Sequence, residues 1–427
     1  MTTMQSPSDG THPGAPRSLR EVWLICIAHC LTHWYPATFY LLLPLIGNEL
    51  GLSYSQIGFI MTCQFVAGAL SNIPGGMLVD TTGRKGLLLA LSLFWVGVPY
   101  LLMSFTHDYW LLLLCVSLVG IGNNLWHPAA IPTLAARFPE RKGFVLSLHG
   151  MGGSVGDALA PVVIGALLAV LGWRSIMLLN VLPGLLMASL ILLYLGSLQV
   201  ARAGTDSDTA GSKKSFEKQT LKQYLAGLKP LFASPGLIML SLSSGFRSMT
   251  QAALLTFLPV YLAREAGFDP FWIGLCLFLL QAAGFAAAPI AGHLSDRMGP
   301  RQVVMGTMAM SGVVLLAMAA MALTGGGAMF IGLIALLGFF LYASRPVMQA
   351  WLLDLTPPGM GGTSIGVLFG IQALCAAVAP AIGGMLADAW GLQAVFQFLA
   401  GTIIAGNVFL LLIPARAAVQ AASLIRP

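Results

Sequence analysis

Residues 75–86 read GGMLVDTTGRKG, and residues 291–302 read AGHLSDRMGPRQ. Both stretches run from small residues through an aspartate to a glycine and basic residues at matching positions. Further matches have nearly the same offset: Leu43-Pro44 with Leu258-Pro259, Ile57-Gly58 with Ile273-Gly274, and Ala160-Pro161 with Ala379-Pro380. An offset that stays within 215 to 219 residues indicates that whole halves of the chain were duplicated in parallel.

The composition excludes a water-soluble fold. Of the 427 residues, 57% are hydrophobic and only 8% are charged, and the mean hydropathy is +0.84. Soluble domains carry roughly a quarter charged residues. The apolar runs are too long for the alternating strands of a barrel, and backbone groups in lipid must be hydrogen-bonded internally. The sequence therefore predicts an all-α membrane protein.

The apolar runs divide into twelve spans, each near the roughly 20 residues that cross a bilayer. Six lie in 21–196 and six in 235–413, so we expect two pseudo-symmetric six-helix bundles. The predicted spans are 21–46, 55–78, 86–106, 110–135, 143–170, 174–196, 235–262, 271–293, 302–323, 328–353, 362–386 and 392–413.

Basic residues predict the sidedness. Nearly all Lys and Arg near span ends fall on one side, and only Arg174 and Arg264 fall on the other. The positive-inside bias then places both termini in the cytoplasm, with the chain in the bacterial inner membrane. We expect cytoplasmic tails at 1–20 and 414–427. The segment 197–234 is predicted to be a cytoplasmic linker that ends in a helix on the membrane surface near 218–229.

The repeated stretch resembles the signature loop of the major facilitator superfamily. Gly76, Asp80, Gly83, Arg84 and Lys85 match the loop between the second and third spans, and Asp296, Gly299 and Arg301 match its second copy. The resemblance implies the major-facilitator-type fold of 12 transmembrane helices, in which substrate passes between the two halves.

These charges are candidates for a gate. A carboxylate at a helix end with guanidinium groups nearby can bridge neighbouring helices on the closed side and release when that side opens. We therefore assign gating to Asp80, Arg84, Lys85, Asp296 and Arg301. The alternative is that these charges only follow the positive-inside bias.

A finer resemblance is to the fosmidomycin-resistance branch, carried by residues 28–31, 120–128 and 152–161. It implies proton-driven drug efflux, which favours export. The small residues of 152–165 resemble the antiporter motif of span five, with Ala160 where glycine is usual; plain helix packing is the alternative. Drug antiporters have an arginine in span four, but this chain has no basic residue around Val116 and Ser117. Their proton relay therefore cannot be assigned to this chain.

Ionisable groups at membrane depth are costly and need a partner or a water-filled cavity. They fall in spans one, four, five, seven and ten, and the resemblance places helices of this set around the central cavity. The candidates are His29, His33, His127, His149, Asp157, Arg247 and Arg345.

Four of these groups are candidates for proton coupling. His29 and His33 lie one turn apart on one face, and imidazole titrates near pH 6.5. Asp157 lies two turns beyond His149, and a buried carboxylate holds its proton until a base or water reaches it. Asp157 is our first candidate for the proton carrier and His33 the second, with His29 and His149 completing the predicted relay.

Two arginines indicate the charge of the substrate. Arg247 and Arg345 keep their charge and bind phosphonate, phosphate or carboxylate through forked hydrogen bonds, so we expect an anionic or zwitterionic substrate. The alternative is a salt bridge to Asp157 or Asp354. The predicted substrate-binding residues are His33, His127, Arg247, Arg345, Tyr40, Asn123, Trp126, Gln251 and Gln349.

Other functions remain open. A metal or metalloid carrier would use Cys26, His29, Cys30 and His33, but four ligands over two turns of one helix cannot all reach one ion, so no metal site is expected. An uptake carrier for an anionic metabolite and a non-transporting receptor are further alternatives. The chain carries no catalytic motif or ATP-binding loop. We expect no enzyme activity, no cofactor, no nucleic-acid partner and a monomer.

Overall fold

The computed structural model describes residues 19–82, 84–196, 231, 234–322, 327–356 and 360–413. The predicted tail 1–20 lies outside these residues except for Leu19 and Arg20, which belong to the first helix, and the predicted tail 414–427 and nearly all of the predicted linker, including the region of its predicted surface helix, lie outside them. Within them the chain forms twelve long helices and one short 3-10 helix, Pro139–Arg141. Each predicted span has its helix, with ends that differ by no more than five residues.

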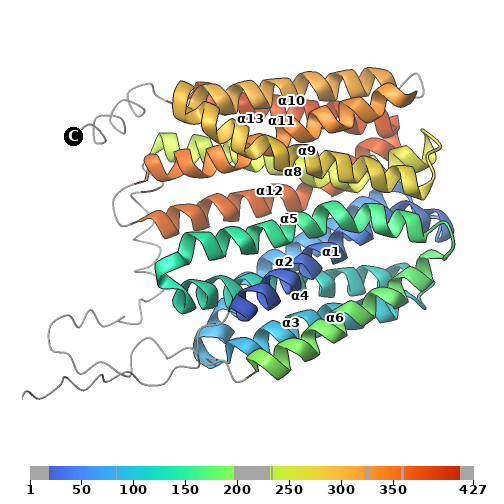
Figure 1. The fold of residues 1–427 in the computed structure, drawn as a ribbon. Helices are drawn as coiled ribbons and strands as arrows, with labels where there is room; N and C mark the ends of the chain where they lie inside the picture. Colours follow the sequence, from blue (N-terminus) through green and yellow to red (C-terminus); the bar gives the residue numbers. More distant parts are fainter. Residues whose placement is uncertain are drawn as a thin grey trace, which may run out of the picture.

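The first half contains α1 to α6 and the second contains α8 to α13 (Figure 1). The helices of the first half are α1 Leu19–Glu49, α2 Tyr54–Thr82, α3 Lys85–Met103, α4 Tyr109–Arg137, α5 Lys142–Leu167 and α6 Trp173–Leu195. Those of the second half are α8 Pro235–Arg264, α9 Pro270–Met298, α10 Pro300–Ala322, α11 Gly327–Asp354, α12 Gly361–Trp390 and α13 Leu392–Leu411. The predicted architecture of two six-helix bundles is confirmed.

Ten of the described helices are long and apolar enough to cross a membrane by length and composition alone, and α1 and α8 are the exceptions. Both are enriched in buried polar groups, with His29 and Thr32 on α1 and Arg247 and Thr250 on α8. A helix that faces protein on most of its sides does not need a lipid-soluble surface. Their lower hydropathy therefore reflects a central position in the bundle.

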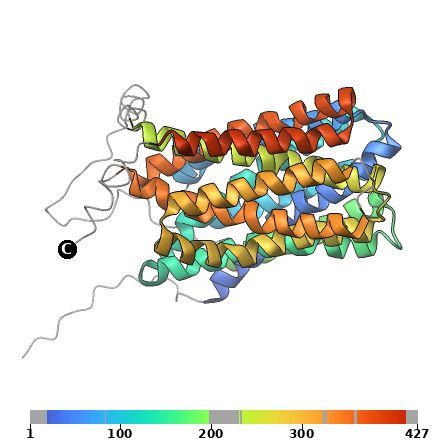
Figure 2. The same ribbon diagram turned by 90° about the horizontal axis from the view of Figure 1, so that it is seen from above.

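The two halves meet along α2 against α12 and along α5 against α9 (Figures 1 and 2). In both pairs the two helices come closest at the same end of the molecule, where a glycine allows the two backbones to touch. A Cβ on Gly58 would lie 2.1 Å from the carbonyl oxygen of Pro380, and one on Gly274 would lie 2.2 Å from that of Pro161. The two contacts are the repeat equivalents of each other, so this end is closed by a pseudo-symmetric pair.

A hydrogen-bonded cap strengthens the α2–α12 contact. The carboxylate of Asp388 on α12 accepts from the backbone N–H of Tyr54 at 2.9 Å and of Ser55 at 2.8 Å, at the start of α2. The first N–H groups of a helix have no partner within that helix, and a negative charge there is stabilising. Asp388 thus links the two halves at the closed end.

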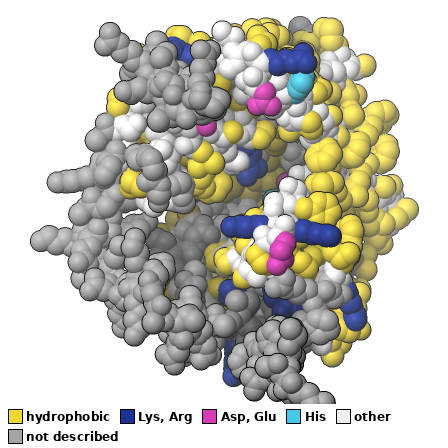
Figure 3. All heavy atoms as spheres, turned by 60° about the vertical axis from the view of Figure 1, so that its left-hand side comes forward, with side chains coloured by type: hydrophobic (Ala, Val, Ile, Leu, Met, Phe, Trp, Pro, Cys, Tyr) yellow, Lys and Arg dark blue, Asp and Glu magenta, His cyan; other side chains and the backbone are white. Residues whose placement is uncertain are grey.

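The same four helices separate toward the other end, which we call the linker end because α6 ends and α8 begins there. No described atom outside the local helix backbone lies within 4 Å of a Cβ built on Gly76 of α2, Gly150 of α5, Gly292 of α9 or Gly366 of α12. Figure 3 turns this end toward the viewer and shows a hollowed surface with basic side chains beside it. Among the described residues, the halves are therefore closed at one end and open at the linker end.

The predicted gate residues lie at the open end. The side chain of Asp80 lies outside the described part of the chain. Asp296 is exposed and has no hydrogen bond or ion pair to any described residue, while Arg301 donates to the carbonyl of Leu411 at 3.3 Å. A latch that joins the two halves at this end would have its bonds broken in an open state. The open state therefore does not test the latch, and gating by these residues stays a prediction.

We expect Gly274→Val to separate the closed end, because its side chain cannot fit against the backbone of Pro161. In a chain carrying Ser55→Cys and Asp388→Cys, a short bifunctional thiol reagent should cross-link α2 to α12, and Gly274→Val should reduce the yield several-fold. Gly292→Val on the same helix is the matched control, since its side chain enters open space. Equal cross-linking in both backgrounds would contradict the closure described above.

Candidate functional site

Close packing of α5 on α1 creates the site. A Cβ on Gly152 would lie 2.5 Å from the carbonyl oxygen of Cys26, and one on Gly156 would lie 2.1 Å from that of Cys30. Small residues at this spacing let two helix backbones approach each other. The glycines of 152–165 therefore do pack helices together, and they bring His149 and Asp157 to the face of α1 that carries His29 and His33.

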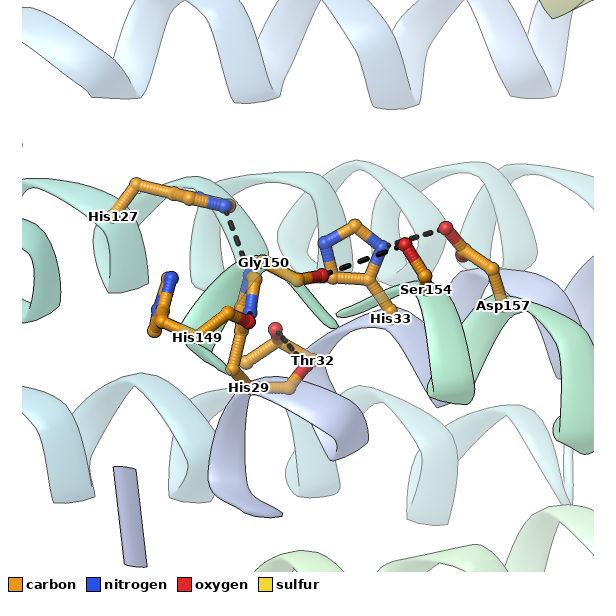
Figure 4. Close-up of polar contacts among 8 residues, drawn as sticks. All are labelled: His29, Thr32, His33, His127, His149, Gly150, Ser154 and Asp157. Atoms are coloured by element: carbon orange, nitrogen blue, oxygen red, sulfur yellow. Dashed lines mark hydrogen bonds and ion pairs between the residues drawn. The ribbon is translucent and has the colours of Figure 1, made fainter. Parts of the chain in front are cut away.

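His29 is the centre of a group of four imidazole rings. Its ring stacks on that of His149 with centroids 3.7 Å apart and lies edge-on to those of His33 at 4.7 Å and His127 at 5.2 Å. Figure 4 shows these side chains converging from α1, α4 and α5. Histidines that are 98 and 120 residues apart in sequence thus share one cluster.

Hydrogen bonds determine which ring nitrogens carry protons. His29 Nδ1 lies 2.6 Å from the carbonyl oxygen of His149, and a carbonyl only accepts, so His29 Nδ1 carries a proton. Trp126 Nε1 donates to His149 Nε2 at 3.2 Å, so that nitrogen carries none. His29 Nε2 remains, and it faces His127 Nε2 at 3.2 Å (Figure 4).

His33 pairs with Asp157. Its Nδ1 lies 2.9 Å from Asp157 Oδ2, and the two side chains are 32% and 31% exposed. The pair joins α1 to α5 on the side of the cluster away from His149 (Figure 4). The pair is thus a carboxylate and an imidazole that share a hydrogen bond within reach of solvent.

The second half contributes a buried cation. Arg247 on α8 is only 2% exposed, and its Nη1 donates to Gln251 Oε1 at 3.1 Å while its Nη2 donates to Ser248 Oγ at 3.4 Å. Its Nε has no hydrogen-bond partner among the described residues. None of the described carboxylates forms an ion pair with it. A buried guanidinium that forms no ion pair is costly unless an anion compensates it.

Arg345 on α11 belongs to the same region. It is exposed, with no ion pair in the described part of the chain, and it lies close enough to His33, His127 and Arg247 to interact with them electrostatically. Tyr342, one turn earlier on α11, also interacts electrostatically with both arginines. Its hydroxyl is buried beside Gln251, the partner of Arg247. Arg345 therefore faces the histidine cluster across the interface between the halves, and Arg247 lies next to Arg345.

Other residues that the sequence singled out are distributed around this centre. Trp126 is fully buried and donates a hydrogen bond to His149. Gln251 accepts a hydrogen bond from Arg247. Tyr40 is buried. Asn123 has a buried amide oxygen that no described group satisfies, and Gln349 is half-buried. The sequence analysis missed Ser248, a partner of Arg247, and Gln64, a buried amide on α2 with an unsatisfied oxygen. A serine or glutamine in an apolar span is too common a feature to indicate either role.

Two alternatives do not hold in the structure. Neither Asp157 nor Asp354 forms the salt bridge to arginine that the sequence left open: Asp157 pairs with His33, and Asp354 is exposed at the end of α11. The four metal ligands on one helix do not assemble either. In the described chain, His29 and His33 meet His127 of α4, and Cys26 and Cys30 are not part of that group.

The sequence matches known proteins along most of its length. A sequence model described as Major Facilitator Superfamily matches residues 25–377 and 240–424. The fosmidomycin resistance protein of Escherichia coli (strain K12) is 25% identical over 381 residues, covering 88% of both chains. The probable sulfoacetate transporter of Cupriavidus necator is 27% identical over 364 residues, covering 82% of each.

Solved structures support the fold. A bacterial homolog of the human lysosomal transporter Spinster, in an inward-facing and unoccupied conformation, superposes with a TM-score of 0.76 at 19% identity. The match covers 96% of this chain and 98% of the other. At this identity the likeness supports the fold and not the chemistry of the site.

We expect Arg247→Met to stabilise the ligand-free protein by about 1 kcal/mol or more, because an apolar side chain of similar length removes an uncompensated buried charge. Thermal unfolding of the purified protein measures the effect as a raised Tm. Arg137→Met is the matched control, since Arg137 bonds the carboxylate of Glu21 through two nitrogens, at 3.0 and 2.6 Å. The control should lose stability, and a similar loss in Arg247→Met would show that Arg247 is structural.

Proposed function

We propose, from the premise that the chain belongs to the major facilitator superfamily, that this membrane transporter exports a small organic anion in exchange for protons. The observation that carries the proposal is the buried Arg247, which has no carboxylate partner among the described residues and lies near a second arginine. Two guanidinium groups that form no ion pair with a described carboxylate attract an anion, and their planar donors suit carboxylate, sulfonate or phosphonate oxygens.

The position of the arginines supports a transported anion rather than a structural one. Arg345 is exposed at the interface between the halves, and the region opens toward the linker end. A site between two repeats can be reached from one side and then the other as the halves rock about it. Polar groups such as Gln251 and Tyr342 surround the charges and provide further contacts for the anion.

Proton coupling is assigned to Asp157 and His33. The pair belongs to the first half, interacts electrostatically with Arg345 of the second half and remains about one-third exposed. A solvent-reachable carboxylate at membrane depth is a group that gains and loses a proton as access alternates. His29 lies edge-on to His33 with ring centroids 4.7 Å apart and stacks on His149, so these two imidazoles are the next candidates along the relay.

Export is the proposed direction, and the name of one relative and the proposed proton coupling support it. One curated relative is named for resistance to fosmidomycin, and another is named as a probable transporter of sulfoacetate, which is an anion. A proton gradient across the bacterial inner membrane drives export when the substrate moves against the proton. With the termini in the cytoplasm, the open linker end is the side from which the substrate enters.

Arg345→Gln is expected to weaken binding of the best anionic ligand by about tenfold or more, because one charge-assisted hydrogen bond contributes roughly 1.5 to 3 kcal/mol. The ligand is first chosen by a thermal-shift screen over phosphonates, sulfonates and carboxylates, and its Kd is then measured by calorimetry. Arg297→Gln, an exposed arginine on α9, is the control. If no anion binds, or if both variants bind as tightly as the parent, the anion site is wrong.

Asp157→Asn should abolish gradient-driven flux and keep anion binding, because the amide holds its hydrogen bond but cannot carry the proton. The assay is anion accumulation in proteoliposomes with an acidic lumen, which drives entry only if anion and proton move in opposite directions. Asp354→Asn, an exposed carboxylate on α11, is the control. Unchanged flux in Asp157→Asn would refute the carrier role, and accumulation that requires an acidic exterior would support uptake instead.

A further inference from the structure

Three imidazole nitrogens converge in the first half. One ring nitrogen from each of His29, His33 and His127 lies within 4.8 Å of the other two. Nδ1 of His33 is occupied by Asp157, and its other nitrogen points toward His29 and His127 (Figure 4). We propose that these three residues form a binding site for a late first-row divalent metal ion such as Zn²⁺, Ni²⁺ or Co²⁺.

The spacing fits a metal ion. Ligand nitrogens lie about 2.0 to 2.1 Å from such an ion, so two ligands of a tetrahedral site are about 3.3 Å apart. His29 Nε2 and His127 Nε2 are 3.2 Å apart. His33 needs only a small ring movement to complete the set, since none of the three separations exceeds 4.8 Å.

The partners of the ligand rings are those that metal sites use. A metal-bound histidine usually donates its other N–H to a backbone carbonyl or a carboxylate, which orients the ring and leaves the ligating nitrogen without a proton. His29 donates through Nδ1 to the carbonyl of His149, and His33 donates through Nδ1 to Asp157. Both rings are therefore held with Nε2 free to bind a cation.

A hydrogen bond alone explains only part of the cluster. One proton between His29 Nε2 and His127 Nε2 would satisfy these two nitrogens. It leaves Nε2 of His33 without a hydrogen bond to any described residue, although His33 lies in the same group of ring nitrogens within 4.8 Å. A metal ion that replaced the proton would bind all three nitrogens at once.

Gly153 keeps room for the ligands. A Cβ at this position would lie 2.9 Å from both His29 Cε1 and His33 Nε2. An alanine would therefore push the two rings from their places although it removes no ligand. The absence of a side chain at Gly153 is thus part of the proposed site.

The donor set indicates the class of metal. Three neutral imidazoles without a thiolate suit Zn²⁺, Ni²⁺, Co²⁺ or Cu²⁺ and leave a fourth position for water or an anion. Asp157 supplies a nearby negative charge, while Arg345 of the other half opposes the bound cation. All three ligands lie on α1 and α4, so the site does not depend on contact between the halves.

The test uses the full-length protein in detergent, purified without a polyhistidine tag. Co²⁺ titration followed by visible absorption should give the bands of a tetrahedral ion at one equivalent per chain, and excess Zn²⁺ should remove them. His33→Gln and His127→Gln should each abolish the bands. His293→Gln, an exposed histidine on α9, should leave them unchanged.

Two variants test the site without removing a ligand. Asp157→Asn keeps the three imidazoles but removes the charge behind His33, and it should lower Co²⁺ affinity by roughly 10- to 100-fold. Gly153→Ala should alter the spectrum or weaken binding. Thermal unfolding and gel filtration check that each variant is folded.

The proposal is overturned if the parent protein gives no tetrahedral Co²⁺ spectrum, or if the spectrum survives both His33→Gln and His127→Gln. Arg345→Gln separates this proposal from the transport function. The Arg345→Gln variant should lose anion affinity and keep the Co²⁺ bands. Failure of the anion site therefore leaves the metal site testable, and failure of the metal site leaves the anion site testable.

Discussion

Backbone contact at glycine is the constraint on which the rest of this structure depends. Lipid provides no hydrophobic force between helices, so membrane helices associate by close packing where side chains are small. Gly152 and Gly156 press α5 onto α1, and Gly58 and Gly274 press the two halves together at the closed end. Bulkier residues at these positions would separate the helices and scatter the side chains that they hold.

The close contact between α1 and α5 has a chemical consequence. It places Asp157 at hydrogen-bond distance from His33 and stacks His149 on His29, so that polar groups within the membrane satisfy one another. Trp126 from α4 completes this arrangement by donating to His149. The cluster is therefore held in a defined geometry, which both a proton path and a metal site require.

Charge is divided between the halves in an unequal way. In the described residues at the centre, the first half contributes imidazoles and one carboxylate, and the second contributes two guanidinium groups. The repeat preserved helix packing, as the equivalent Gly58 and Gly274 contacts show, but it did not preserve the site. An anion between the halves would be bound mainly by the second half, while the first half carries the groups that exchange protons or bind a metal ion.

The sequence by itself determined the twelve helices, the duplication and the depth of the ionisable groups, because hydropathy, repeat offset and helical periodicity are properties of one chain segment at a time. It also placed His29 and His33 on one face, since residues four apart on a helix lie together. Only the tertiary structure decided that His127 joins them, that Asp157 pairs with His33 rather than with an arginine, and that Arg247 is left without a carboxylate among the described residues. These outcomes depend on how each helix is rotated and which helix it packs against, and that is set by contacts between segments about 100 residues or more apart, which no local pattern encodes.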